Sequence, residues 1–193
     1  MTTATAPTRD RLLDAAVELF AERGYTETTV GDIEEAAGLV PRAGAMYKHF
    51  ASKDELALYL FERCHVRVWT ICSAALSRGT GFEEKLEEFV GAWLDLLDTE
   101  PEVLAFLADS ARVLWPRSST TVRRKTMIGL ARALVSESPA VRRRSGAIDH
   151  DVAAASMQGT LSELGRMIQV GVVPGPARRW HRQLVTLFLQ LGQ

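Results

Sequence analysis

The chain has few of the residues that define several common protein classes. Its 193 residues include two cysteines, Cys64 and Cys72, too few for a disulfide scaffold. If both lie on one helix, they are about 12 Å apart along its axis and too far apart to bridge, so we expect small buried apolar residues. No unbroken apolar run approaches the roughly 18 residues of a membrane span. The opening segment MTTATAPTRD has no apolar core, so we expect no signal peptide and a cytoplasmic protein without a membrane partner.

Neither sign of charge is in excess, because the net charge is −1 and 24% of the residues are charged. With 47% hydrophobic residues, this composition excludes a disordered chain and a uniformly basic nucleic-acid coat. The sequence also lacks a glycine-rich phosphate loop and a nucleophile–base set in supporting context. The histidines His65, His150 and His181 set no metal-ligand spacing. We therefore expect no catalytic residue, metal site or cofactor.

Helical periodicity dominates the chain, and no convincing strand alternation is present, so the predicted fold is all-α with about nine helices. The first helix is expected over residues 8–23 and ends at Gly24. A helix cap is expected at Thr29–Asp32, and capping boxes are expected at Ser52–Glu55 and Thr80–Glu83. Later helices are expected from residue 101 to the Trp115-Pro116 pair, over 119–136, 149–170 and 177–191, with an arginine-rich loop at 138–146.

Residues 24–56 contain two short predicted helices, one capped by Thr29 and ended by Gly38, the other running from Pro41 to about Tyr47. This spacing is typical of a helix-turn-helix, whose second helix enters the DNA major groove. An ordered run of residues here resembles the tetracycline-repressor (TetR) family of transcriptional regulators. The run comprises Ala15-Ala16, Leu19-Phe20, Arg23-Gly24-Tyr25, Thr28-Thr29-Val30, Ile33, Ala36-Ala37-Gly38-Leu39, Tyr47-Lys48-His49-Phe50 and Ser52-Lys53-Asp54-Glu55-Leu56.

The resemblance implies a three-helix helix-turn-helix DNA-binding domain over residues 1–51 and a helical ligand-binding and dimerisation domain over 52–193. The stretch Leu39–Met46 is about two residues longer than the family pattern, so Val40 and Pro41 fall in a lengthened turn or an extra half-turn of helix. Residues 1–55 carry six Lys and Arg against ten Asp and Glu. A DNA-binding domain is normally basic. A local basic cluster from Arg42 to Lys53 is nevertheless sufficient for contact with a few phosphates.

The resemblance also implies roles for individual residues on double-stranded DNA. Thr28 and Thr29 are expected at a phosphate, although Thr29 is alternatively only a helix cap. Arg42 is the candidate for a base contact, because its planar fork matches guanine O6 and N7. The small side chains of Ala43 and Ala45 allow close approach to a thymine methyl. Further contacts, mostly to flanking phosphates, are expected from Tyr47, Lys48, His49 and Lys53, while Phe50 is assigned to the core.

The remainder of the chain is expected to bind a small hydrophobic effector and to form a homodimer through about residues 149–191. The candidate cavity-lining residues are large and apolar: Trp69, Trp93, Phe106, Trp115, Met127, Met157 and Leu161. For each of them, an ordinary core position is the alternative interpretation. The most direct functional hypothesis is a ligand-responsive repressor that binds a near-palindromic operator. The alternatives are an all-α small-molecule-binding protein or enzyme without DNA binding, and an interaction module that has lost DNA binding.

Overall fold

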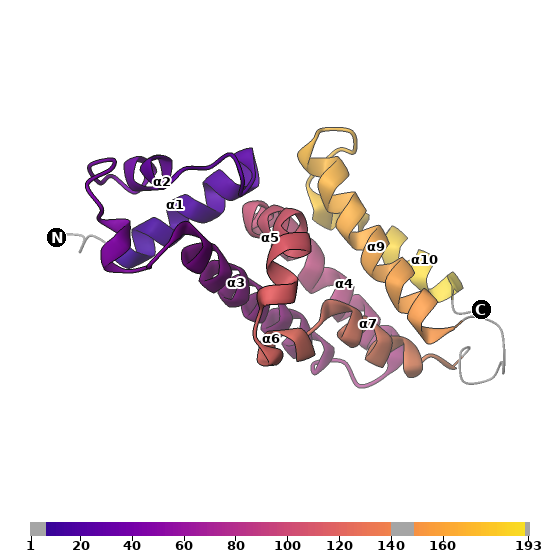
Figure 1. Ribbon diagram of the computed structural model, residues 1–193. Coiled ribbons are helices and arrows are strands. Elements are labelled where there is room, and N and C mark those ends of the chain that lie inside the picture. The colour runs from indigo at the N-terminus through magenta and orange to yellow at the C-terminus, as the bar shows by residue number, and fades with distance from the viewer. Residues whose placement is uncertain (1–6, 140–148, 192–193) are drawn as a thin grey trace, which may run out of the picture. The chain divides into compact units, whose positions relative to one another are not determined.

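The computed structural model describes residues 7–139 and 149–191 (Figure 1). Every regular element within these residues is helical, which confirms the all-α prediction. The α-helices are α1 (Thr8–Arg23), α2 (Val30–Ala36), α3 (Lys53–Leu76), α4 (Phe82–Thr99), α5 (Pro101–Leu114), α6 (Thr120–Arg124), α7 (Met127–Ser136), α9 (His150–Gln169) and α10 (His181–Leu191). Short 3-10 helices are η1 (Met46–Lys48), η2 (Trp115–Arg117) and η3 (Ala177–Trp180).

The chain divides into two compact units, and α3 contributes residues to both. The first unit comprises Met1–His65 and Glu102–Thr120, and the second comprises Val66–Pro101 and Thr121–Gln193. The predicted functional domains, 1–51 and 52–193, stay a prediction.

The core of the first unit is aromatic. Phe20 of α1, Phe61 of α3 and Phe106 of α5 are almost fully buried. The rings of Phe20 and Phe106 stack with centroids 5.5 Å apart, and Phe61 meets Phe106 edge-on at 6.3 Å. Aromatic pairs in these arrangements stabilise a core beyond the area they bury. These contacts therefore hold α1 and α3 against α5, although Phe106 lies about ninety residues after Phe20 in the chain.

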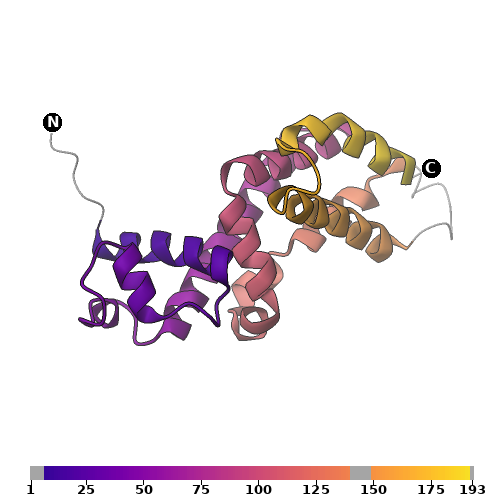
Figure 2. The ribbon, with the colours of Figure 1, turned by 90° about the horizontal axis from the view of Figure 1, so that it is seen from above.

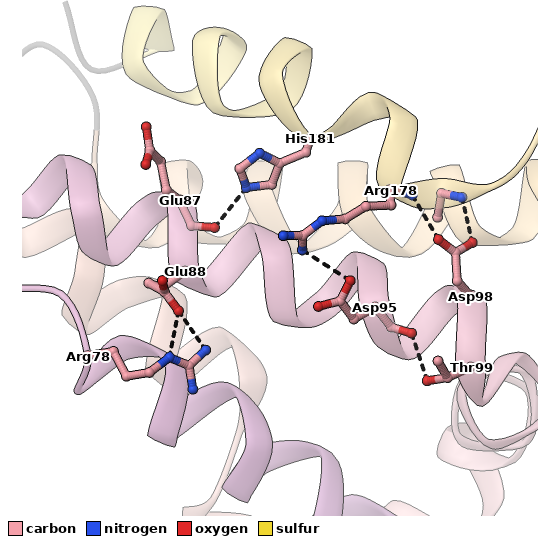
Figure 3. Close-up of polar contacts among 9 residues, drawn as sticks. Arg78, Glu87, Glu88, Asp95, Asp98, Thr99, Arg178 and His181 are labelled. Atoms are coloured by element: carbon pink, nitrogen blue, oxygen red, sulfur yellow. Dashed lines mark hydrogen bonds and ion pairs between the residues drawn. The ribbon is translucent and has the colours of Figure 1, made fainter.

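In the second unit, η3 and α10 pack on α4, and α9 packs on α7 (Figures 1 and 2). Asp98 of α4 accepts hydrogen bonds from the backbone N–H groups of Ala177 (2.5 Å) and Arg178 (2.9 Å) at the start of η3, as Figure 3 shows. His181 begins α10 with its Nε2 2.9 Å from the Glu87 carbonyl oxygen. These contacts fix the entry of the last helix against α4.

Two glycines of the second unit lie close to side chains of other elements. A Cβ at Gly165 of α9 would lie 2.3 Å from Leu97 Cδ2, and a Cβ at Gly91 of α4 would lie 2.7 Å from Arg178 Nη1. At Gly165 the absence of a Cβ therefore maintains the observed spacing of α9 and α4, whereas at Gly91 the flexible end of Arg178 is the only group that a Cβ would displace.

The local sequence rules correctly predict most helix ends. Gly24 (φ +83°) and Gly38 (φ +68°) follow α1 and α2 in the left-handed region that favours glycine. The predicted capping box at Thr80–Glu83 is wrong, because Glu84 accepts the Thr80 N–H and hydroxyl while the helix begins at Phe82.

The single helix predicted over residues 119–136 is also wrong. Thr126, in an extended conformation, accepts the Gly129 N–H and starts α7 as a separate helix. The predicted loop at 138–146, with its three arginines, falls almost entirely outside the described residues. Cys64 and Cys72 are buried as predicted, and burial raises the pKa of the Cys72 thiol to about 12.

Candidate nucleic-acid interface

The candidate interface begins at the first turn of α2, which Thr29 caps as predicted, through a capping box with Asp32. The Thr29 hydroxyl accepts the Asp32 N–H at 3.2 Å, and the Asp32 carboxylate accepts the Thr29 N–H at 2.8 Å. The Thr29 hydroxyl also donates to the Asp32 carboxylate at 2.7 Å. This bond, followed by the bond from the Thr29 N–H and by the charges of Arg23 and Arg42, holds the pKa of Asp32 below its usual range. Thr29 remains exposed, but its hydroxyl lies beside an anionic carboxylate rather than an open site.

The segment after α2 is where the structure departs most from the prediction. The expected helix from Pro41 to about Tyr47 is absent, and only the 3-10 helix Met46–Lys48 forms. Arg42 (φ +62°) and Gly44 (φ +76°) both adopt the left-handed region, which a right-handed helix cannot contain. For arginine this conformation costs about 1–2 kcal/mol. Residues 39–49, hereafter the reading turn, therefore replace the second helix of a helix-turn-helix.

The reading turn is anchored on Glu34, which sequence reasoning missed. The Glu34 side chain is fully buried, and its carboxylate accepts the N–H groups of Arg42 at 2.7 Å and Met46 at 2.9 Å. The signal available in the sequence was an acidic residue directly after the buried Ile33, on the inner side of a short amphipathic helix. Charged residues are rarely buried without compensating bonds, so such a position calls for partners.

Most of the predicted contact residues do lie together on the surface of the reading turn. Arg42, Ala43, Tyr47, Lys48 and His49 are exposed, and Ala45 is half-buried. Phe50 is buried, as predicted.

The reading turn also carries a candidate contact that sequence reasoning did not select. The Val40 side chain is 72% exposed, the largest exposed fraction among the large hydrophobic residues described. The only available signal was its place in the lengthened turn. One short exposed segment thus carries three groups with different recognition chemistry: the Arg42 guanidinium, the Lys48 ammonium and the apolar Val40 side chain.

Two predicted contacts are not available at this surface. Thr28 is fully buried, and its hydroxyl donates to the carbonyl oxygens of Gly24 (2.9 Å) and Leu19 (3.3 Å). The Lys53 ammonium has three N–H donors, and it faces the carbonyl oxygens of Tyr25 (2.9 Å), Thr28 (2.9 Å) and Thr26 (3.5 Å). A phosphate contact by either side chain would require breaking bonds that hold the fold, so both are corrected to structural roles.

A chain of polar contacts continues from Lys53 to η2. The Lys53 ammonium lies 4.5 Å from the Tyr25 ring centre, the Tyr25 hydroxyl donates to Asp54, and Asp54 pairs with Arg117 at 3.1 Å. Burial, followed by the bond to Asp54, raises the pKa of Tyr25 to about 12. The same bond, followed by Arg117, lowers the pKa of Asp54.

The predicted effector-binding residues do not form one group. Phe106 and Trp115 belong to the first unit, where Phe106 is a core residue and Trp115 meets His65 edge-on at 5.2 Å. Trp69, Trp93, Met127, Met157 and Leu161 belong to the second unit. Among these, Met127, Met157, Leu161 and Trp93 are buried, while Trp69 is half-buried under the Lys125 ammonium at 4.8 Å.

Trp93 differs from the other four because it is polar and unsatisfied. Its side chain is 5% exposed, and its indole Nε1 has no hydrogen-bond acceptor among the residues that the structure describes. Buried indole N–H groups usually find an acceptor. A separate open hollow of about 360 Å³ is lined by Ser73, Leu76, Ser77, Gly79, Lys85, Ala133, Leu134 and Glu137, none of which was predicted.

Residues 7–139 and 149–191 contain neither a candidate metal-binding cluster nor a candidate membrane-spanning helix. No group of three His, Cys, Asp or Glu side chains there is arranged to hold a metal ion. No helix of the same ranges is long and apolar enough to cross a bilayer.

The exposed reading turn directly after α2 occupies the place in the chain where the second helix of a helix-turn-helix is expected. Residues 12–60 match the sequence model of a family described as bacterial regulatory proteins, tetR family. Over these residues the chain is similar to the tetR family.

Individual proteins are similar to this chain as well. The HTH-type transcriptional repressor KstR2 of Rhodococcus jostii is 31% identical over 106 residues, which cover 55% of this chain and 51% of that protein. The chain thus matches about half the length of this relative. The structure of ketosteroid transcriptional regulator KstR2 of Mycobacterium tuberculosis superposes with a TM-score of 0.80 at 21% identity, covering 97% and 95% of the two chains. The FadR regulator of Bacillus subtilis, solved with stearoyl-CoA, gives 0.70 at 18% identity and 93% and 97% coverage. At these identities the two structures share the fold.

Proposed function

We propose that this chain is a ligand-responsive transcriptional regulator that binds a near-palindromic DNA operator as a dimer. The observation that carries the proposal is the reading turn, an exposed segment with Arg42, Tyr47, Lys48 and His49 in a region that matches a regulatory family. Arg42 is the proposed base-reading residue, and Tyr47, Lys48 and His49 contact phosphates. Ala43, Ala45 and the exposed Val40 approach thymine methyl groups.

The exclusion of Thr28 and Lys53 leaves the reading turn as the main source of DNA contacts, with Thr29 at its edge. The first 55 residues have an acidic balance, so general attraction to DNA is weak. Specific binding then depends on the few phosphates beside the reading turn and on contacts with base edges. This predicts a high ratio of specific to non-specific affinity.

Repression is the proposed direction of control. The R. jostii relative is a transcriptional repressor, and a dimer seated on an operator blocks a promoter without further contacts. No catalytic role is assigned to any residue. The proposed site of action is the cytoplasm, where bacterial DNA is found.

The proposed effector is a small, largely apolar molecule with at least one hydrogen-bond acceptor. Support comes from the buried Trp93 indole N–H, which lacks an acceptor in the described chain, and from the buried Met127, Met157 and Leu161 of the same unit. Met side chains adapt readily to an apolar guest. The ketosteroid skeleton and the stearoyl chain of stearoyl-CoA, named with the two similar structures, are apolar groups that carry carbonyl acceptors, although the CoA part is polar and charged.

The proposed dimer interface lies on α9 and α10, within residues 149–191. Val152 of α9 is 58% exposed and Leu187 of α10 is 42% exposed. A Cβ added at the exposed Gly159 would have no neighbour within 4 Å, so the helix face at this position is open. Two helices from each protomer would bury these apolar side chains in a four-helix interface.

Selection from a pool of randomised duplexes tests the DNA-binding proposal. The wild-type protein should enrich a near-palindromic sequence with half-sites about 34 Å apart. Arg42→Ala should lose about 1–3 kcal/mol of binding free energy and relax one base position in each half-site. Arg63→Ala serves as the control, because Arg63 is an exposed arginine of α3 with only a 3.8 Å pair to Asp10. Failure of the wild-type protein to enrich any sequence would contradict the proposal.

A further inference from the structure

The turn that carries the proposed DNA contacts is organised around one buried carboxylate. Glu34 accepts the Arg42 N–H through Oε2 at 2.7 Å and the Met46 N–H through Oε1 at 2.9 Å. Its main-chain oxygen accepts the Leu39 N–H at 2.8 Å. Three backbone N–H groups of the reading turn, those of Leu39, Arg42 and Met46, are therefore bonded to the same residue.

The bond to Arg42 acts at the most strained point of the turn. Arg42 is the one residue other than glycine with a positive φ (+62°) in the described chain. Such a conformation persists where surrounding contacts fix it, and strained residues of this kind concentrate at functional sites. The Glu34 carboxylate supplies a contact of this type directly to the Arg42 N–H.

The conformation of the Arg42 backbone also sets the direction of its side chain. The Arg42 side chain passes beside the first turn of α2, with its Cγ 3.7 Å and its Nε 3.9 Å from where a Gly31 Cβ would lie. The Arg42 charge is close enough to lower the pKa of Asp32 as well. A return of Arg42 to the ordinary right-handed region would move the guanidinium away from this position.

We infer that Glu34 is a positioning residue for DNA recognition, whose buried carboxylate fixes the left-handed backbone at Arg42 and so aims its guanidinium at a base edge. This inference rests on the proposed function and extends it to a residue that cannot itself touch DNA. It also accounts for the lengthened turn, since the carboxylate provides acceptors for the N–H groups of a segment that does not form a helix.

Glu34→Gln is the most informative variant, because glutamine has nearly the same shape but only one acceptor oxygen. Its amide NH₂ would face a backbone N–H, so one of the two bonds is lost while the volume of the core is kept. The bond from Leu39 is made by the main chain and survives the change. Glu35→Gln provides the matched control, since Glu35 is the exposed neighbour in the same helix.

The first measurement is amide hydrogen exchange by NMR and needs no DNA. The Arg42 and Met46 amides should be protected in the wild-type protein, and at least one should exchange about 10- to 100-fold faster in Glu34→Gln, the range for losing a hydrogen bond to a charged group. The Glu35→Gln protein should match the wild type. Exchange of both amides at the unfolded-chain rate in the wild-type protein would overturn the inference.

The second measurement compares binding to the duplex selected by the wild-type protein with binding to a shuffled duplex of the same composition. Glu34→Gln should reduce the preference for the selected duplex about 10- to 100-fold while leaving affinity for the shuffled duplex unchanged. A residue that only stabilised the fold would lower both affinities together, or neither.

Retention of the full preference by a folded Glu34→Gln protein would overturn the positioning role. Equal binding of all duplexes by the wild-type protein would contradict the proposed function and remove the basis of the inference with it. The wild-type titration and the variant titration therefore separate the two failures.

Discussion

The ammonium of Lys53 lies against Tyr25 in two ways, 2.9 Å from its carbonyl oxygen and 4.5 Å from the centre of its ring. Lys53 is the first residue of α3, and Tyr25 lies in the connection between α1 and α2. The Lys53 ammonium thus ties the α1–α2 connection to the start of α3, and it donates a second hydrogen bond to the Thr28 carbonyl oxygen. A lysine that resembles a phosphate contact in the sequence is an internal cross-link of the first unit.

Lys53→Ala should therefore lower the stability of the first unit, by about 1–3 kcal/mol, because charged hydrogen bonds to backbone carbonyls are lost. Lys48→Ala is the control, since Lys48 is exposed on the reading turn. It should leave the unfolding midpoint unchanged, weaken binding to all DNA sequences alike and reduce the dependence of binding on salt. Denaturant unfolding and anisotropy titrations at several salt concentrations measure both effects. Equal midpoints for the two variants would show that Lys53 has no special structural role.

Replacing each of two α9 glycines with alanine should change the stability of the protein in opposite directions. A Cβ at Gly165 would lie 2.3 Å from Leu97 Cδ2, so Leu97 must change rotamer or the helices must separate. We expect Gly165→Ala to destabilise the fold by about 1–3 kcal/mol, as overpacking does. Gly159 has nothing within 4 Å, and Gly159→Ala should instead stabilise the helix by about 0.5–1 kcal/mol. Thermal unfolding of the two proteins decides this, and a stable Gly165→Ala protein would contradict the close packing of α9.

The raised pKa of Tyr25 predicts a loss of stability in alkali. The folded chain holds the phenol proton more tightly than the unfolded chain does, because the pKa rises from 10.0 to about 12. The contribution of the hydroxyl is therefore fully present below pH 10.0 and is lost as the pH rises toward about 12. Tyr25→Phe should lower the free energy of unfolding by a constant amount at neutral pH, and this deficit should shrink through the same alkaline range. A deficit independent of pH up to about 12 would argue against the Asp54 bond.

Dimer formation should depend on Leu187. Leu187→Glu places a charge on the exposed apolar face of α10, so it should produce monomers and abolish operator binding, which needs two linked half-sites. Arg182→Glu places the same residue at an exposed position of α10 about 140° around the helix from Leu187, and it should leave the dimer intact. Light scattering gives the mass directly. A dimeric Leu187→Glu protein would place the interface elsewhere.

An apolar effector and the operator should weaken each other's binding by the same factor. Allosteric coupling of this kind is typically about 1–3 kcal/mol, which corresponds to roughly 5- to 150-fold. Tryptophan fluorescence titrations with and without the selected duplex measure the effector affinity, with medium- and long-chain fatty acyl compounds and sterols as the ligands. Anisotropy titrations with and without the same ligands measure the DNA affinity. Trp93→Phe removes the unsatisfied indole N–H and should weaken effectors that carry an acceptor oxygen. Tight binding with identical affinity in both titrations would mean that the guest is not a switch.

The sequence predicted the helical fold well because its signals are local. Apolar spacing, the Thr29 cap and the glycines after α1 and α2 each act within a few residues. The reading turn was mispredicted because its shape depends on Glu34, a side chain eight residues before Arg42, together with a left-handed arginine that no propensity favours. The roles of Thr28 and Lys53 were misassigned for a related reason. Their acceptors are backbone carbonyls brought close only by folding, which residue type and spacing cannot reveal.

The most direct test of the whole account is the ratio of two dissociation constants for the wild-type protein, measured by fluorescence anisotropy at one fixed salt concentration. One duplex is the sequence enriched by selection, and the other is the same composition shuffled. The account predicts a preference of about 1,000-fold or more for the selected duplex, as specific DNA-binding proteins show. Equal dissociation constants would contradict the claim that the reading turn recognises a DNA sequence.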